Sequence, residues 1–357
     1  MPTLPLYAQT LTAGEPESWH RINAPGGYET WQFYAAGEND LWAGASLSWG
    51  STFLPGYLRR YERYRRRPTR YAPPVPKEHC SASFAVFQGG RQLARFDTPV
   101  NGDAFNISRG HTGVSVGANR MTVDEKGRLH LNLRGTPWRE RWRAPMLMHD
   151  RTVSAQLVFE PVAAPMPREL DWLGAETPVH RYALSRPLCK VSGDIAIFEG
   201  SASPPKVVQL RGRGCHEHTW GTRPMSWDFG YEMKGHVFDE GRTFAFELLR
   251  HRREKKTVAR IVGVDVSGAR DVEVEPRVSG WARVGTAGLR FPRTIELGEL
   301  LALEEPRVLA ASLFDAHVIY EARWADRKAT AVCRCISFGR LRNGVVANAF
   351  GLAVGRG

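Results

Sequence analysis

The chain has 357 residues, 42% of them hydrophobic and 24% charged, with a formal net charge of +12. This ordinary globular composition excludes wholesale disorder, the positive charge indicates anionic partners or surfaces, and no apolar run approaches the roughly 18 residues of a membrane-spanning helix. Residues 1–19 lack the basic and apolar regions of a signal peptide, and five irregularly spaced cysteines argue against a disulfide framework and favour a reducing, cytoplasmic compartment.

Strand patterns dominate the chain. Residues 81–87 and 91–96 flank the pair Gly89 and Gly90, which predicts a hairpin. Alternating or β-branched segments follow at residues 129–133, 153–159, 194–198, 207–211, 243–248, 259–266, 271–275, 314–324 and 331–338. Only residues 58–67 and 294–302 have helical patterns. These short strands, separated by turn residues, predict an all-β protein of antiparallel barrels or sandwiches with few short helices.

A faint internal repeat suggests that the fold is duplicated. Trp31 and Phe33 precede a turn and the strand pattern of residues 41–49, and Trp227 and Phe229 precede a similar turn and strand at 242–249. A Pro-rich stretch at residues 161–178 lies between the two copies. We therefore predict an N-terminal domain of residues 1–190 and a C-terminal domain of residues 191–357.

The densest group of side chains that could act in acid–base catalysis lies in residues 213–221. Strand alternation places His216, His218 and Trp220 on one face and Glu217 on the other. In aromatic surroundings, desolvation raises the pKa of a glutamate, as a general acid requires, although an adjacent protonated histidine opposes that rise. The same residues are also compatible with a cluster of satisfied polar groups on an edge strand.

Other chemistries have weaker patterns. His216 and His218 share a strand face and could ligate zinc together with His236, but neither an HExxH motif nor a cysteine pair supports a metal. Cys333 and Cys335 are best explained as alternate core positions of one strand. The sequence contains no P-loop, no dinucleotide-binding fingerprint and no Gly-x-Ser-x-Gly elbow, so hydride and phosphoryl transfer have no sequence support.

The stretch from Arg59 to Arg70 carries seven arginines and one glutamate, interleaved with tyrosines. It is compatible with a solvated basic helix, with peripheral contact at the inner face of a membrane, or with nucleic-acid binding. Because no nucleic-acid module accompanies it, we expect no nucleic-acid partner.

Four stretches in order resemble one known family. They are residues 27–35, an aromatic strand; residues 50–57, a Gly-Ser-x-Phe-x-Pro-x-Tyr segment followed by the arginines and by residues 78–80; residues 212–229, with a Gly-x-Gly-x-x-Glu-x-x-Trp-Gly motif and a Ser-Trp-Asp-Phe run; and residues 336–341. This set is similar to that of the hydroxyneurosporene synthases, also called carotenoid 1,2-hydratases, and their lipocalin-like relatives. Glu217 stands where that family has Asp, and Cys215 where it has Tyr.

The resemblance implies two consecutive lipocalin-like β-barrels and a cofactor-free hydration of an acyclic carotenoid or related polyene. It implies that Glu217 protonates the alkene and that His218 and Asp228 orient water. A lipophilic substrate would contact the remaining site residues, which are Trp31, Phe33, Tyr34, His216, Trp220, Trp227 and Phe229. Two alternatives stay open, a cyclase or isomerase of the Diels–Alderase type and a non-enzymatic carrier of a hydrophobic molecule.

Overall fold

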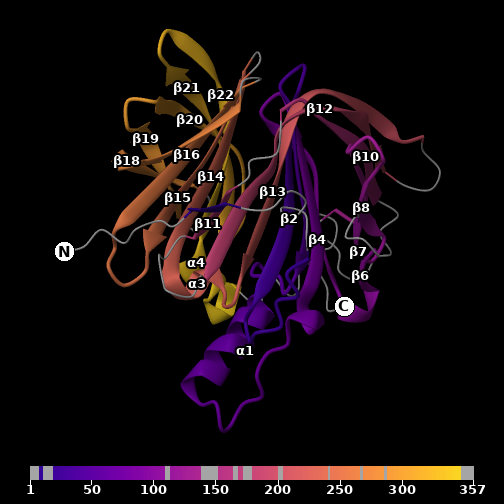
Figure 1. Ribbon diagram of the computed structural model, residues 1–357, viewed down its shortest axis with the longest axis vertical. Coiled ribbons are helices and arrows are strands. Elements are labelled where there is room, and N and C mark those ends of the chain that lie inside the picture. The colour runs from indigo at the N-terminus through magenta and orange to yellow at the C-terminus, as the bar shows by residue number, and fades with distance from the viewer. Residues whose placement is uncertain are drawn as a thin grey trace.

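The computed structural model describes residues 8–10, 19–108, 113–137, 152–163, 168–171, 179–199, 204–239, 242–265, 268–284 and 288–346. In this part of the chain, two large antiparallel sheets stand side by side, each curved around its own apolar core (Figure 1). The predicted all-β class with few short helices is confirmed.

The first sheet has thirteen strands within the described residues. Its main path has the order β5-β4-β3-β2-β13-β12-β10-β9-β8-β7-β6, and β1 pairs with β11, which in turn pairs with β12. The strands are β1 (Ala8–Thr10), β2 (Tyr28–Gly37), β3 (Leu41–Trp49), β4 (Cys80–Gln88), β5 (Arg91–Val100), β6 (Phe105–Ile107), β7 (Gly113–Val116), β8 (Asn119–Val123), β9 (Leu129–Gly135), β10 (Thr152–Pro161), β11 (Arg168–Asp171), β12 (His180–Phe198) and β13 (Lys206–Gly221).

The second sheet has nine strands within the described residues, in the order β17-β16-β15-β14-β22-β21-β20-β19-β18. In both sheets a first long strand pairs with the last one, and the strands between them meander outward on both sides. The strands are β14 (Phe229–Asp239), β15 (Arg242–His251), β16 (Thr257–Asp265), β17 (Gly268–Val274), β18 (Pro276–Val284), β19 (Leu289–Leu297), β20 (Leu301–Ala311), β21 (Asp315–Trp324) and β22 (Arg327–Ser337).

The shared topology places β2 and β3 in the first sheet where β14 and β15 stand in the second. The Trp-x-Phe motif is not equivalent in the two copies, because Trp31 and Phe33 lie inside β2 whereas Trp227 lies in a short helix before β14. The chain changes sheet between Gly221 and Phe229. The predicted domain boundary at residue 190 lies inside β12, of which only residues 194–198 are predicted as a strand from the sequence.

The helices are α1 (Pro55–Arg66), α3 (Met225–Asp228) and α4 (Phe338–Leu341), with the 3-10 turns η2 (Pro76–His79) and η3 (Gly102–Ala104). The helix predicted at residues 58–67 is confirmed as α1, which opens on a proline where a missing N–H costs nothing. Among the described residues, no helix is long and apolar enough to span a membrane.

The helix predicted at residues 294–302 is wrong. This segment forms the end of β19, a turn and the start of β20, with Ile295 opposite Leu303 and Leu297 opposite Leu301. The apolar residues therefore alternate inward along two strands instead of lining one face of a helix. Gly298 adopts a φ of +59°, which closes the turn between the strands.

The two sheets meet through both apolar and polar side chains. Tyr182 and Leu184 of the first sheet pack against Val262 and Val264 of the second, and Phe87 packs in a cluster with Ile319. The polar groups between the sheets come from strand faces that point away from each barrel core. Buried polar residues at a contact between two sheets are the natural place to look for chemistry.

Candidate active site between the two sheets

Strand β13 divides the residues of its motif between two regions. His216 stacks on Phe33 and His218 stacks on Trp31, with ring centroids 4.4 and 4.6 Å apart, on the inner face of the first sheet. Glu217 points the other way, toward the second sheet, as strand alternation predicts. The motif therefore does not form one site.

Glu217 is the centre of a buried polar cluster. Its Oε1 accepts hydrogen bonds from the Tyr182 hydroxyl and from His236 Nε2, both at 2.8 Å. Its Oε2 lies 3.5 Å from Lys234 Nζ, which also donates to Gln32 Oε1 at 2.9 Å. Because Lys234 and His236 belong to β14, the carboxylate joins the first sheet to the second.

The electrostatics reverse the expected state of Glu217. Burial by itself would raise the pKa of this carboxyl, but Lys234, His236 and the hydroxyl of Tyr182 together lower the pKa to about 2. The expectation of a raised pKa is therefore wrong, because the aromatic surroundings come with a buried cation. Glu217 is therefore an ionised carboxylate at neutral pH. It accepts hydrogen bonds from its neighbours and does not itself carry a proton.

A second carboxyl beside this cluster behaves in the opposite way. Burial raises the pKa of Glu247 well above its usual range; Lys234 at 3.8 Å opposes the rise, and Glu232 adds to it. Glu247 therefore keeps a proton where Glu217 has lost one. Environments that push the pKa values of nearby carboxyls apart are typical of acid–base sites.

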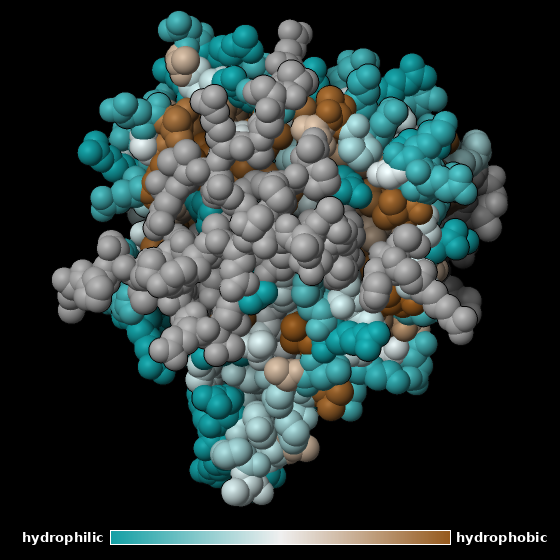
Figure 2. Space-filling view, viewed as in Figure 1, coloured by the Kyte–Doolittle hydropathy of each residue, from teal (hydrophilic) through white to brown (hydrophobic). Residues whose placement is uncertain are grey.

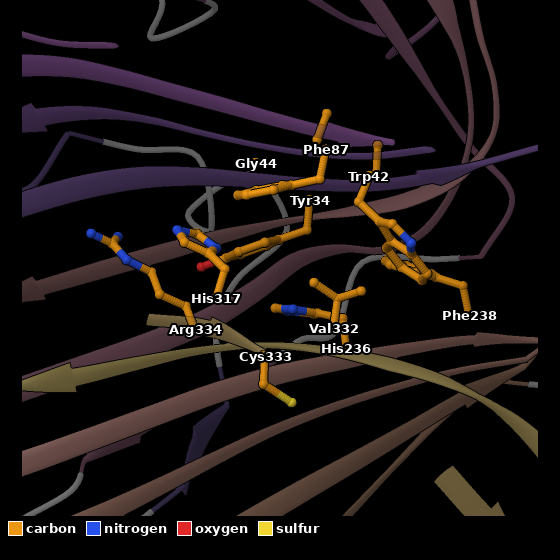
Figure 3. A pocket seen from close by; sticks show the side chains of 12 residues that line it. Tyr34, Trp42, Gly44, Phe87, His236, Phe238, His317, Val332, Cys333 and Arg334 are labelled. Atoms are coloured by element: carbon orange, nitrogen blue, oxygen red, sulfur yellow. The ribbon is translucent and has the colours of Figure 1, made fainter. Parts of the chain in front are cut away.

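A small aromatic cavity borders the cluster (Figure 3). Its volume is about 30 Å³, and Tyr34 stacks on His236 in its wall with ring centroids 4.0 Å apart. A neighbouring cavity of about 40 Å³ shares Tyr34 with it. These volumes fit water molecules and not a polyene. The other rings and groups of the first cavity include Trp42, Phe87, Phe238, His317 and Arg334.

His317 faces the cavity from a charged network. Arg95 forms a two-point hydrogen-bonded pair with Asp315, with distances of 3.1 and 2.9 Å, and Arg334 Nη2 lies 3.1 Å from the same carboxylate. Burial lowers the pKa of His317 to about 3, with Arg95 and Arg334 adding to the fall against the effect of Asp315. His317 is therefore a neutral imidazole at neutral pH.

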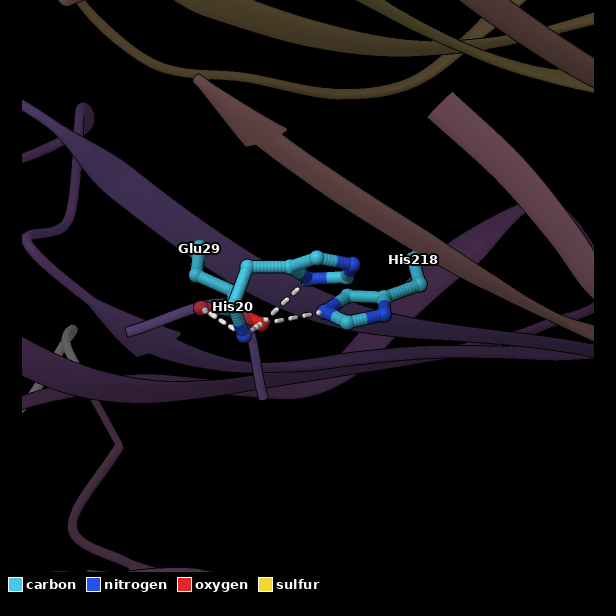
Figure 4. A group of neighbouring side chains, drawn as sticks. All are labelled: His20, Glu29 and His218. Atoms are coloured by element: carbon cyan, nitrogen blue, oxygen red, sulfur yellow. Dashed lines mark hydrogen bonds and ion pairs between the residues drawn. The ribbon is translucent and has the colours of Figure 1, made fainter. Parts of the chain in front are cut away.

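On the inner face of the first sheet, His218 joins a different group (Figure 4). Glu29 Oε1 lies 3.0 Å from His20 Nδ1 and 3.1 Å from His218 Nε2. His20 also stacks on Trp220 with ring centroids 3.8 Å apart. The hydrogen bonds from both histidines lower the pKa of Glu29 even though burial acts to raise it.

The metal set considered from the sequence is not assembled. His216 and His218 lie on the inner face of the first sheet, whereas His236 lies between the sheets and binds Glu217. In the part of the chain that the structure describes, two other groups have ligand atoms within 4.8 Å of one another. They are His20, Glu29 and His218, and Cys215, Glu217 and His236. In both, the carboxylate already accepts hydrogen bonds from its histidine neighbours.

The last group of predicted site residues lies near α3. Asp228 accepts two hydrogen bonds from Arg223, at 2.7 and 2.8 Å, and lies 2.9 Å from His180 Nε2. Trp227 packs edge-on against Tyr61 of α1, and Phe229 packs in a cluster with Phe314 and Phe338. Of the three predicted catalytic residues, Glu217 lies between the sheets, His218 lies inside the first barrel, and Asp228, the last residue of α3, forms an ion pair with Arg223.

Sequence reasoning missed most partners of Glu217. In β14 the odd positions, such as Met233 and Val237, fill the core of the second sheet, while Glu232, Lys234 and His236 are buried on the opposite face. The sequence shows the polar alternation, which is ordinarily typical of a solvent-facing strand surface. Only the contact with the first sheet turns that surface into a buried site.

No protein-family model matches the chain. A hydroxyneurosporene dehydrogenase of Chlorobaculum tepidum is 31% identical over 218 residues, and the match covers 58% of this chain and 53%, about half, of that curated relative. A Nitrosomonas europaea protein assigned to AttH superposes with a TM-score of 0.60 at 11% identity, covering 92% of this chain and 97% of that one. Kievitone hydratase of Nectria haematococca superposes with a TM-score of 0.50 at 8% identity, covering 92% and 95%. The resemblance to hydroxyneurosporene proteins and the lipocalin-like fold are confirmed.

Proposed function

We propose that this relative of the hydroxyneurosporene proteins is a hydratase that adds water to a C=C bond of an acyclic carotenoid or a related lipophilic polyene. One observation carries the proposal: His236 is hydrogen-bonded to the buried carboxylate of Glu217 and also lines an aromatic cavity. Protonation of an alkene requires an acid held in a fixed orientation, and the faces of aromatic rings beside it stabilise the cation that forms.

The first step is proton transfer to the less substituted carbon of the alkene. His236 is the member of the pair that lines the cavity, so its ring donates the proton and Glu217 orients the ring. The Tyr182 hydroxyl and Lys234 keep Glu217 ionised and in place. Glu217 thus acts as a positioning residue, and the sequence-based role of direct acid passes to His236.

The carbocation formed in this step must be stabilised by side chains of the cavity that do not react with it. Tyr34 lies directly on the His236 ring, and Trp42, Phe87 and Phe238 complete the aromatic lining. Burial holds the pKa of Tyr34 well above its usual range, so its hydroxyl stays protonated and does not trap the cation as a phenolate. The faces of these rings attract positive charge.

Water then adds to the cation, and the product loses a proton. His317 lines the same cavity as a neutral imidazole, and its low pKa still suffices because a protonated alcohol is a strong acid. The proton taken up by His317 returns to His236 through water, so the net change is the addition of one water across the double bond. A cavity of about 30 Å³ holds that water, and a polyene end enters only when the side chains between the sheets move apart.

Mass spectrometry of neurosporene and lycopene after incubation with the protein in lipid dispersions tests this function. We expect a product heavier by one water with the wild-type chain, and a rate reduced by at least about a hundredfold with His236→Gln. His130→Gln is the matched control, because His130 also lies 2.9 Å from a carboxylate, that of Asp124, but on the surface of the first sheet.

Other outcomes have definite meanings. A product lighter by two hydrogens would show dehydrogenation, as the name of the Chlorobaculum tepidum relative suggests for that protein, and would overturn hydration. A polyene that binds and is returned unchanged would identify a carrier. Cyclised product formed equally well by wild type and His236→Gln would favour the Diels–Alderase alternative.

A further inference from the structure

A second cavity lies at the end of the second sheet, away from the aromatic site. Its volume is about 410 Å³. The first residues of β14, the end of β15, the start of β19 and α4 contribute to its wall. Five basic side chains line it, which are Arg250, Arg252, Lys255, Arg290 and Arg340.

This concentration of charge has little internal compensation. Among the described residues, none of the five forms an ion pair with a carboxylate within 4 Å, and Arg340 Nη2 donates instead to the carbonyl oxygen of Gly288 at 3.3 Å. Arg250 and Arg290 are exposed to solvent. Cations brought together in a concave surface without acidic partners attract anions.

An aromatic side chain stands at the rim of this cavity. Trp281 is 37% exposed, although it packs edge-on against Tyr231 with ring centroids 5.5 Å apart. An exposed tryptophan beside arginines has the amphipathic character of residues that sit at the headgroup level of a bilayer. The cavity thus combines phosphate-binding and interfacial chemistry.

The arginines of α1 belong to the same end of the molecule (Figure 1). Arg342, just after α4, pairs with Glu62 of α1 and lies over the Trp227 ring, as does Arg65. Desolvation, Arg342 and, more weakly, Arg253 and Arg66 lower the pKa of Arg252, whereas Glu62 of α1 opposes the fall, so the charges of α1 and of the cavity interact. In the space-filling view, the projecting end that carries α1 is mostly hydrophilic (Figure 2).

We propose that this end of the molecule docks on a bilayer, with the basic cavity receiving the phosphate headgroup of an anionic phospholipid and the α1 arginines lying along the surface. The adjoining basic helix and the rim tryptophan favour a lipid over a free phosphate compound, because both extend the contact beyond one anion. The inference concerns binding alone, so it stands or falls independently of the proposed hydration.

Cosedimentation with phosphatidylcholine vesicles, with and without phosphatidylglycerol, tests the docking. We expect binding only to the anionic vesicles, weakening as salt rises, and reduced roughly tenfold or more by Arg250→Glu/Arg290→Glu. The matched control is Arg91→Glu/Arg120→Glu, which changes the net charge equally at two exposed positions of the first sheet. Unfolding melts establish that both doubles are folded, and Arg250→Gln/Arg290→Gln repeats the test without charge reversal.

The vesicle-binding results distinguish a headgroup site from attraction by net charge and from binding of a free phosphate compound. Loss with both cavity doubles but not with the control supports the headgroup site, and an additional loss with Arg65→Glu/Arg66→Glu supports the role of α1. Equal loss with the cavity and control doubles would mean attraction by net charge only and would overturn the site. Binding of glycerol phosphate or pyrophosphate without vesicle binding would overturn the lipid assignment.

Discussion

The two faces of β13 belong to different regions of the molecule. On the inner face, His218 Nε2 lies 3.1 Å from Glu29 Oε1 among stacked aromatic rings inside the first barrel. On the outer face, one residue earlier, Glu217 is buried against Lys234 and His236 of the other sheet. Both carboxylates have lowered pKa values, and His236, the partner of Glu217, lines the aromatic cavity between the sheets.

The difference shows that burial and a histidine partner do not by themselves make a site. Two histidines within one barrel contact the Glu29 carboxylate. This network holds the segment before β2, which carries His20, against β2 and β13. Glu217 links the two sheets through Lys234 and His236. The proposed mechanism places the chemistry on this outer face, where the sheets would have to separate locally to admit a substrate, and assigns structural cohesion to the inner face.

The largest expected effect is on turnover. Glu217→Gln keeps the shape of the side chain but removes the charge that orients His236 and balances Lys234, so we expect the rate to fall about 10²- to 10⁴-fold. Glu29→Gln makes the same change on the inner face and should leave the rate per folded molecule within a few-fold. Both rates are measured by conversion of neurosporene, normalised to the folded fraction.

Equal losses of turnover in Glu217→Gln and Glu29→Gln would contradict the proposal that only the outer face of β13 takes part in the chemistry. A fall confined to Glu29→Gln would place the chemistry inside the first barrel. The pH dependence of the remaining rate in Glu217→Gln separates a positioning role from a purely structural one, because a changed proton donor alters the profile.

The charged network between the sheets should carry a large share of the stability. Asp315→Asn leaves the buried Arg95 and the half-buried Arg334 without their shared carboxylate, and we expect the free energy of unfolding to fall by about 3–5 kcal/mol. Denaturant unfolding followed by tryptophan fluorescence measures it. The surface change Asp124→Asn is the control and should have little effect. A similarly small effect of Asp315→Asn would show that the sheets do not depend on this network.

Part of the fold and of the candidate site could be predicted from the sequence alone. The hairpin of β4 and β5, the helix α1 and the all-β class follow from local patterns, because turn residues and strand alternation are written in neighbouring positions. The opposite orientations of Glu217 and His218 follow from strand alternation as well. The resemblance to hydroxyneurosporene proteins points to the segment in which Glu217 lies.

The partners of Glu217 could not be predicted in the same way. Lys234 comes from a strand of the other sheet, and Gln32 lies 202 residues before Lys234. The ionised state of Glu217 depends on that distant cation, so a local view of aromatic neighbours gives the wrong sign for its pKa shift. Arg95 likewise meets His317 and Arg334, which lie opposite each other on β21 and β22, only because the two sheets face each other.

The pH dependence of stability should reveal the neutral His317 between the sheets. Since the pKa of His317 falls from 6.5 to about 3 on folding, its contribution is complete above pH 6.5 and is lost as the pH falls toward 3. The loss is roughly 1.4 kcal/mol per pH unit within that window. Asp97 opposes it, because burial raises its pKa to about 6, with Asp315 adding to the rise against Arg95 and Arg334, and its contribution is lost as pH rises through 6.

The difference between wild type and His317→Gln therefore isolates the histidine. We expect the variant to lose less stability than the wild type between pH 6.5 and 4.5, by about 2–3 kcal/mol, in unfolding curves collected across that range. Parallel curves for the two proteins would show that His317 is hydrated and titrates normally.

The smallest expected effect tests the inner face directly. His218→Asn removes the contact of 3.1 Å with Glu29 and the stack on Trp31, so we expect the free energy of unfolding to fall by about 1–3 kcal/mol. His20→Asn should cost less, because its side chain is 19% exposed and water can replace the lost hydrogen bond. Turnover per folded molecule should change little in either variant. If His218→Asn abolished turnover while its unfolding curve matched the wild type, the motif histidine would be catalytic after all. The chemistry would then belong inside the first barrel, and Glu217 would serve to hold the two sheets together.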